Sequence, residues 1–441
     1  MKLLSKETLY VICLSLPFYS EVIRKYLYFD NIVYIVSDSI LFLVALFIFF
    51  RLQHFFLYAY LLLISAYVSW AIIPYLFSEH NPVLISVGIR PLLIPYCCMI
   101  IAFALFNTQR TEVADKMMNI NAVFWILLAG SVALLQLYLG PNHPINALPN
   151  ELSKLSGQGI GDYSVNGHVI KGLFRPASIF LHTGKFGQFA FVTSLAVVSR
   201  IAGYFRASPV QMFLILFCAI IIFISGQRSS MVLFTFYFLM FFVYNKKINF
   251  QFLFFILLAS ALLIVLVPQE YLLFPLIRTV SGVSDASTRF SGTSSNLSEI
   301  LSSYSVFGEG IGFFTFGSKQ FGGSVLYEYS KIFSASENGW LRIVAESGII
   351  GAAIYLVLMT SIVIRSYKAL RELPAPRKWL AFTSFSVSIG FMLWALTHDL
   401  FGNYLSMLML FTFFGASEGS LYRHRLGEIN GQQSNNTART A

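Results

Sequence analysis

Four arginines lie within or beside the ends of apolar runs, and a fifth lies in a long polar segment. Arg228 follows the turn in ISGQRSSMV, Arg289 lies in a long polar segment, and Arg90, Arg175 and Arg342 lie within or beside the starts of apolar runs. A guanidinium near lipid is costly to dehydrate and usually has an anionic partner. Its planar fork can bind two phosphate oxygens at once. These residues therefore predict a site for a phosphorylated ligand. For any one of them alone, a structural role in an ion pair is favoured.

A proton acceptor is expected at the end of the same polar segment. Glu337 lies where this segment meets an apolar run, and its carboxylate can take a proton from a hydroxyl nucleophile. An equally weighted alternative is a structural ion pair with Arg342 or Lys331. His182 and His398 are further candidates, although a lone histidine at a helix end more often serves structure.

Composition places these residues on a membrane scaffold. Hydrophobic residues make up 57% of the chain and charged residues 11%, against roughly 25% in an ordinary soluble domain. With repeated apolar runs of spanning length, residues 1–441 are predicted to form a single all-α polytopic membrane domain. The formal charge of +10 does not indicate nucleic acid, because the basic residues are dispersed. No cofactor is expected. All four cysteines fall in apolar runs, so they suggest neither a disulfide framework nor a metal site.

About twelve spans are predicted from the apolar runs. They cover residues 8–24, 31–50, 55–77, 83–106, 118–140, 177–198, 209–225, 229–244, 250–267, 338–364, 379–397 and 402–421. More than half of the 30 Lys and Arg residues fall in alternate, mostly short loops. The positive-inside rule places those loops and both termini in the cytoplasm.

Two long loops, 141–176 and 268–337, are then predicted to face outward, with short turns at 78–82 and 397–403 on the same side. Residues 426–441 are polar and predicted to form a disordered cytoplasmic tail. Function is expected at the outward face, because apolar helices carry few groups that can do chemistry. The glycine-rich FGEGIGFFTFG, residues 307–317, is interpreted there as a tight turn region.

The order of these motifs resembles the bacterial O-antigen ligases and O-antigen polymerases, with the related exopolysaccharide and capsule polymerases. The resemblance covers the second half best. It rests on FRPASIFLHTGKFG around Arg175, SGQR ending at Arg228, TRFSG containing Arg289, the glycine segment, and SENGWLRIVAESGIIG with its Glu337–Asn338 pair. Ligases typically carry His-Asn or His-Ser at that pair. The carboxylate here favours a polymerase.

The resemblance implies a metal-independent membrane glycosyltransferase. An acceptor sugar hydroxyl would attack the anomeric carbon of a saccharide linked to undecaprenyl diphosphate in the inner membrane of a bacterium. It implies Arg228 and Arg289 at the departing diphosphate and Glu337 as base, with Arg90, Arg175, His182, Asn338 and Arg342 as further substrate-binding candidates. Expected partners are the lipid-linked oligosaccharide and membrane lipid, with a chain-length regulator and a flippase.

Two other classes remain open. An O-antigen ligase would transfer finished polysaccharide to lipid A–core, and only Glu337 argues against it. A polysaccharide or lipid transporter would also have many spans. It should, however, show broken or polar helices near the membrane centre and often an internal repeat, whereas here the polar content lies at the outer face.

Overall fold

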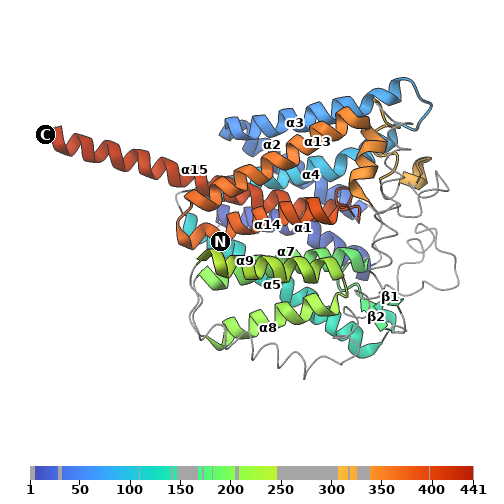
Figure 1. Ribbon diagram of the computed structural model, residues 1–441, viewed down its shortest axis with the longest axis horizontal. Coiled ribbons are helices and arrows are strands. Elements are labelled where there is room, and N and C mark those ends of the chain that lie inside the picture. The colour runs from blue at the N-terminus through green and yellow to red at the C-terminus, as the bar shows by residue number, and fades with distance from the viewer. Residues whose placement is uncertain are drawn as a thin grey trace.

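The helices of the chain lie side by side in one bundle, as the computed structural model shows (Figure 1). The first half comprises α1 (Lys6–Tyr26), α2 (Ile32–Leu52), α3 (Phe55–Ile72) with the short η1 (Ile73–Leu76), α4 (Val83–Phe106), α5 (Thr111–Leu139) and η2 (Pro144–Asn146). The structure describes residues 5–27, 32–108, 110–140, 143–146, 167–170, 173–180, 182–203, 208–245, 306–315, 318–324, 338–396 and 398–440.

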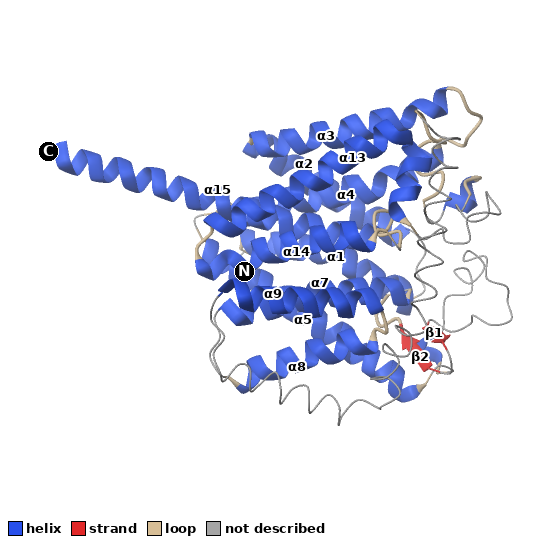
Figure 2. Cartoon of the chain, viewed as in Figure 1, coloured by secondary structure: helices blue, strands red, loops and turns tan. Residues whose placement is uncertain are grey.

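The second half begins with a hairpin of two antiparallel strands, β1 (Gly167–Ile170) and β2 (Leu173–Pro176), drawn red in Figure 2. It pairs His168 with Arg175. The helices that follow are α7 (Thr183–Gly203), α8 (Pro209–Ile224), α9 (Arg228–Asn245), η3 (Ser318–Phe321), α13 (Gly339–Glu372), η4 (Ala375–Arg377), α14 (Lys378–Trp394) and α15 (Tyr404–Thr440). Each predicted span overlaps a helix except 250–267, which lies outside the described residues, and the span predicted at 177–198 becomes a helix only from Thr183.

These helices make the chain an α-helical membrane protein. Six described segments are long and apolar enough to cross a membrane, namely 32–52, 55–76, 83–106, 111–139, 183–203 and 339–372, and two shorter apolar helices occupy 209–224 and 229–240. The segments 83–106 and 183–203 are far more buried than the others, so α4 and α7 form the inside of the bundle. The predicted all-α membrane class is confirmed, with the β1–β2 hairpin as an addition.

The bundle centre is formed by α4 and α15, which make the most extensive helix contact among the described elements. Gly415 and Gly419 of α15 lie one turn apart and touch the backbone of α4. A Cβ at either glycine would lie within 3.0 Å of a carbonyl oxygen, that of Met99 or of Phe103 respectively. The pair therefore lets two helix backbones approach closely, which favours packing of helices in a membrane.

Helix α13 is broken near its start. Gly348 has a φ of 66° and a ψ of −173°, a conformation that a residue with a side chain rarely adopts. The break frees carbonyl oxygens, and other segments satisfy them. Backbone N–H groups of Glu309 and Gly310 donate to the carbonyl oxygens of Ala345 and Glu346, each at 2.9 Å. Residues 306–315 thus replace the helical hydrogen bonds that the break removes, as apolar surroundings require.

The two ends of the bundle differ in content. The hairpin, residues 306–315 and 318–324, and the η1–α4 connection lie at one end, which we call the hairpin end. The start of α1 and the end of α15 lie toward the other, the basic end (Figure 1). At the basic end Arg200 donates to Asp115 at 2.8 Å and Trp379 donates to the same carboxylate at 2.7 Å. The described parts of the two predicted outward loops thus share one end.

The C-terminal segment differs from its prediction. Helix α15 continues to Thr440 and projects beyond the bundle (Figure 1), whereas a disordered tail was expected over 426–441. The segment contains no proline, so nothing in it interrupts the hydrogen-bond ladder that begins in the packed part of α15.

Candidate functional site

Arg90 of α4 lies between two tyrosine rings at the hairpin end. Its guanidinium carbon is 4.7 Å from the ring centroid of Tyr34 and 4.4 Å from that of Tyr404, within the range of cation–π attraction. Its Nε donates to Asp38 at 2.7 Å, and the Tyr404 hydroxyl donates to the other oxygen of Asp38 at 3.0 Å. Its Nη2 is buried without a hydrogen-bond partner among the described residues. The predicted binding residue Arg90 is therefore held rigidly, with donor capacity to spare.

A second ion pair, between Lys185 and Glu21, is linked to Arg90 through Tyr34. The Tyr34 hydroxyl donates to Glu21 at 2.8 Å, and the Lys185 ammonium contacts the same carboxylate oxygen at 2.8 Å. Arg24 lies 4.8 Å from the Tyr34 ring centroid. Glu21 is fully buried, so its charge must be balanced locally, and Lys185 supplies that balance.

A buried lysine lies at the end of the same helix as Arg24 and Glu21. Lys25 is 1% exposed and donates to the carbonyl oxygen of Ser178. Ser178, which has a φ of 57°, is also held by Gln136, whose side-chain oxygen accepts from its N–H at 2.8 Å. The turn between β2 and α7 is therefore fixed against α1 and α5.

The cationic cluster is the name we give to Arg24, Lys25, Arg90 and Lys185. Among the described residues, these four basic side chains lie beside two carboxylates, Glu21 and Asp38. Burial lowers the pKa of Lys25 to about 7, so Lys25 carries only part of a charge near neutral pH. The cluster thus carries excess positive charge at the hairpin end of α1, α4 and α7. Excess guanidinium and ammonium charge in a poorly hydrated place suits an anion with several oxygens, such as a phosphate ester.

The segment around Arg175 contacts the SGQR turn that precedes Arg228, although the two are remote in sequence. The guanidinium of Arg175, in β2, donates to the carbonyl oxygen of Ser225 from Nε at 3.3 Å and from Nη2 at 3.2 Å. Gly226 follows with a φ of 61°, and a Cβ there would lie 2.9 Å from the Arg175 Nε. The turn before Arg228 therefore packs directly on Arg175. Arg228 is the first residue of α9.

Arg342 has a different environment from the cationic cluster. It forms ion pairs with Glu346, one helical turn on, and with Asp399 at 2.8 Å, and it donates to the Thr315 hydroxyl at 3.1 Å. Glu346 also accepts from the Phe314 N–H at 2.9 Å. Arg342 thus holds the glycine segment and the α14–α15 turn onto the start of α13. These contacts fit the structural interpretation of this arginine.

The remaining predicted residues are placed as follows. The side chain of Asn338 accepts from the N–H groups of Trp340 and Leu341 at 2.9 and 3.1 Å, and so caps the start of α13. The carbonyl of His182 accepts from Phe186 N–H at 3.3 Å in the first turn of α7. Glu337 and Arg289 lie outside the described residues.

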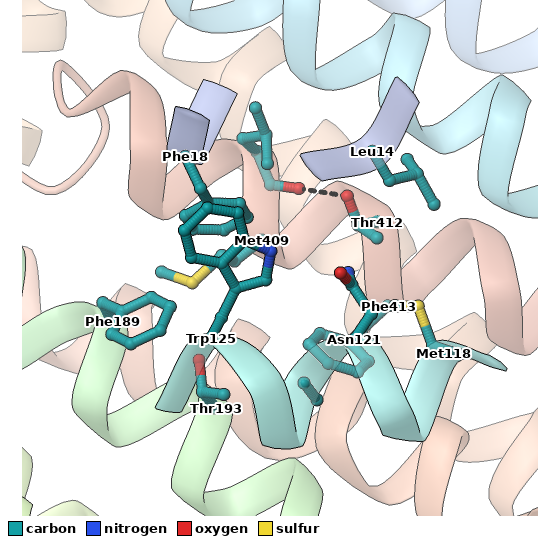
Figure 3. Close-up of a pocket in the computed structure, with 12 residues that line it drawn as sticks. Leu14, Phe18, Met118, Asn121, Trp125, Phe189, Thr193, Met409, Thr412 and Phe413 are labelled. Atoms are coloured by element: carbon teal, nitrogen blue, oxygen red, sulfur yellow. Dashed lines mark hydrogen bonds between the residues drawn. The ribbon is translucent and has the colours of Figure 1, made fainter. Parts of the chain in front are cut away.

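A small apolar cavity lies between α1, α5, α7 and α15 (Figure 3). Its walls include Phe18, Trp125 and Phe189, and its volume is about 40 Å³. A single water needs about 10–15 Å³, so the space suits a few small molecules at most and is far too small for a lipid chain. It carries no site for a long isoprenyl group.

Sequence reasoning missed the partners of the cationic cluster. Asp38 falls inside an apolar run, and a carboxylate at such a place signals a buried ion pair. Tyr34 and Tyr404 gave no signal, because tyrosines are common near membrane interfaces. His80 and Glu309, which lie 2.9 Å apart at the hairpin end, were also missed, since 229 positions separate them in the chain.

Searches among protein families and among characterised proteins found no family model and no curated protein that matches this chain.

Proposed function

We propose that this chain is a polymerase of saccharide repeat units carried on undecaprenyl diphosphate, acting in the synthesis of O-antigen, exopolysaccharide or capsule. The observation that carries the proposal is the cationic cluster, in which Arg24, Lys25, Arg90 and Lys185 outnumber the carboxylates beside them. It lies at the hairpin end of the bundle, where the Arg90 and Lys185 side chains are 33% and 21% exposed. The saccharide part of the substrate is inferred from the order of the arginine motifs, which resembles that of the O-antigen polymerases.

The proposed reaction uses cations to stabilise a leaving group. An acceptor sugar hydroxyl bonds to the anomeric carbon of the donor, and the bond from that carbon to the diphosphate oxygen breaks with its electron pair. Negative charge grows on the diphosphate as the bond breaks, so preorganised cations stabilise the transition state more than the ground state. Arg228 and Arg289 are assigned to the diphosphate, and Arg90 and Arg175 contribute further positive charge. The proposal requires no metal ion.

The proposed orientation places the hairpin end outside the bacterial cytoplasmic membrane and the basic end inside. It has twelve spans, both termini in the cytoplasm, and loops 141–176 and 268–337 outside. The basic residues of the alternate loops motivate it. A chain-length regulator and a flippase are the proposed protein partners, because the donor must cross the membrane before it is used.

Reconstitution with a chemically defined donor tests this function. Purified protein in liposomes, given an undecaprenyl-diphosphate-linked repeat unit, should release undecaprenyl diphosphate and form a ladder of longer saccharides, also in the presence of EDTA. Arg90→Ala should strongly reduce both products. Arg371→Ala is the matched control, since Arg371 is exposed at the basic end of α13.

Each other outcome has a defined meaning. A single transfer that occurs only when lipid A–core is added would identify a ligase. An intact donor that appears in the opposite leaflet would identify a transporter. An intact donor with no movement would reject both the enzyme and the transporter.

A further inference from the structure

His80 and Glu309 form a solvent-accessible acid–base pair at the hairpin end. His80 Nε2 lies 2.9 Å from Glu309 Oε2, and the two side chains are 24% and 21% exposed. His80 belongs to the short connection between η1 and α4. The ring lies 4.4 Å from the ring centroid of Phe313, which limits its rotation. The pair is thus ordered and still open to a substrate.

The protein backbone holds Glu309 firmly in place. Its own N–H donates to the carbonyl oxygen of Ala345 at 2.9 Å, where α13 is broken. Two residues later, Ile311 donates to the carbonyl oxygen of Ala71 at 2.9 Å and accepts from the Tyr75 hydroxyl at 2.7 Å. Segments from α3, η1 and α13 therefore fix the carboxylate that faces His80.

This contact sets which ring nitrogen of His80 can act as a base. An ionised carboxylate only accepts hydrogen bonds, so the Nε2 atom facing Glu309 carries the proton. The neutral ring then keeps its lone pair on Nδ1, which has no hydrogen-bond partner in the part of the chain that the structure describes. A carboxylate that orients an imidazole in this way also stabilises the imidazolium formed when Nδ1 takes a proton.

The position of the pair suits the outer part of a lipid-anchored donor. Helix α4 starts at Val83 and carries Arg90, so its start lies about 10 Å nearer the hairpin end than Arg90 does. A lipid diphosphate held at the level of Arg90 would extend its saccharide in that direction. His80 therefore stands on the saccharide side of the cationic cluster.

We propose that His80 is the general base that activates the acceptor hydroxyl and that Glu309 is its positioning residue. This assignment rests on the proposed polymerase function. The acceptor oxygen forms its bond to the anomeric carbon as its proton passes to His80 Nδ1. The electron pair of the broken bond leaves with the diphosphate, and the imidazolium later returns the proton to water. Glu309 makes no contact with substrate and acts only through the ring.

Glutamine substitutions at the pair provide the first test, in the full-length protein with the lipid-linked repeat unit. His80→Gln should lower the elongation rate roughly a hundredfold or more while the donor dissociation constant stays within about twofold. Glu309→Gln should cause a smaller loss of rate. Glu79→Gln is the matched control, because Glu79 is the exposed neighbour of His80 and should leave the rate unchanged.

Chemical rescue separates a catalytic role from a structural one. Added imidazole should restore part of the rate to His80→Ala, and it should not affect Glu337→Gln.

Three results would overturn the assignment. A normal rate in His80→Gln would exclude the ring as base. Loss of donor binding without rescue by imidazole would make the pair structural. Loss of turnover in Glu337→Gln alone would assign the base to Glu337. A wild-type protein that elongates no acceptor would instead reject the proposed function, and the assignment with it.

Discussion

The guanidinium of Arg175 binds the carbonyl oxygen of Ser225 through two nitrogen atoms, at 3.3 and 3.2 Å, across 50 positions of sequence. Ser225 is the C-terminal cap of α8, where carbonyl groups lack helical partners. The arginine therefore supplies the missing donors and fixes the turn that leads into α9. Two of the predicted arginine motifs are thus parts of one structural unit, with Arg228 directly after it.

Substitution of Arg228 or Arg289 should distinguish geometry from charge. Either Arg→Ala variant should abolish polymer formation with normal amounts of protein in the membrane. Arg→Lys should restore little, because an ammonium cannot reproduce the bidentate fork. Polymer length on gels and protein level by immunoblot are the measurements, with Arg371→Lys as control. Full activity of both lysine variants would leave only charge as the requirement.

Reporter fusions should place the two ends of the bundle on opposite sides of the membrane. A fusion after Gly322, at the hairpin end, should be active only for a reporter that works outside the cytoplasm. A fusion within η4, at Ala375, should be active only for a cytoplasmic reporter. The basic residues near η4 are the physical reason. Signals from the same side at both positions would contradict the twelve-span orientation.

The close contact of α4 and α15 predicts that one added methyl group at Gly415 or Gly419 will destabilise the folded protein. Gly415→Ala or Gly419→Ala should lower the free energy of unfolding by about 1–3 kcal/mol, because the new Cβ would overlap a carbonyl oxygen of α4. Gly427→Ala in the same helix is the control, since nothing lies within 4 Å of its Cβ position. Thermal unfolding in detergent measures all three. Equal melting temperatures would mean that the helices can separate without loss.

His54 should make the stability depend on pH. Burial, with a smaller contribution from Arg365, lowers the pKa of His54 below its ordinary value of about 6.5. The unfolded chain then binds the proton more readily than the folded one, so stability is lost as pH falls below that value. Neutral His54 also caps α3, because its Nδ1 accepts from the Phe56 N–H at 3.2 Å.

His54→Asn keeps a cap and removes the titration. Its melting temperature should fall less than that of the wild type between neutral and mildly acidic pH. Parallel curves for the two proteins would exclude His54 as the titrating group.

The sequence predicted the helices well, because an apolar run of spanning length permits few other structures in a membrane. Helix α4 begins at Val83 and ends at Phe106, as its apolar run indicates. The partners of charged groups were harder to predict. Arg90 and Asp38 are 52 positions apart, and no local pattern joins them. Pairing of that kind depends on how helices are arranged, which periodicity alone does not encode.

Local backbone breaks were equally hidden from sequence reasoning. Gly348 lies in an apolar run that also contains Gly351, and a glycine in such a run is usually tolerated within a helix. The reason that a glycine is needed at this break lies in a distant segment, because the carbonyl of Val306 occupies the space that a Cβ at Gly348 would fill. The expected tail at 426–441 was judged from composition alone, which does not reveal that a helix begun upstream continues through it.

The packing of α15 against α4 bears on the order in which the protein assembles. Helix α15 is synthesised long after α4, its partner at the bundle centre. The backbone of α4 around Met99 and Phe103 therefore stays without its final neighbour until α15 has been synthesised. Closure of the bundle centre therefore requires α15, and a chain that stops before Gly415 would leave this surface of α4 uncovered.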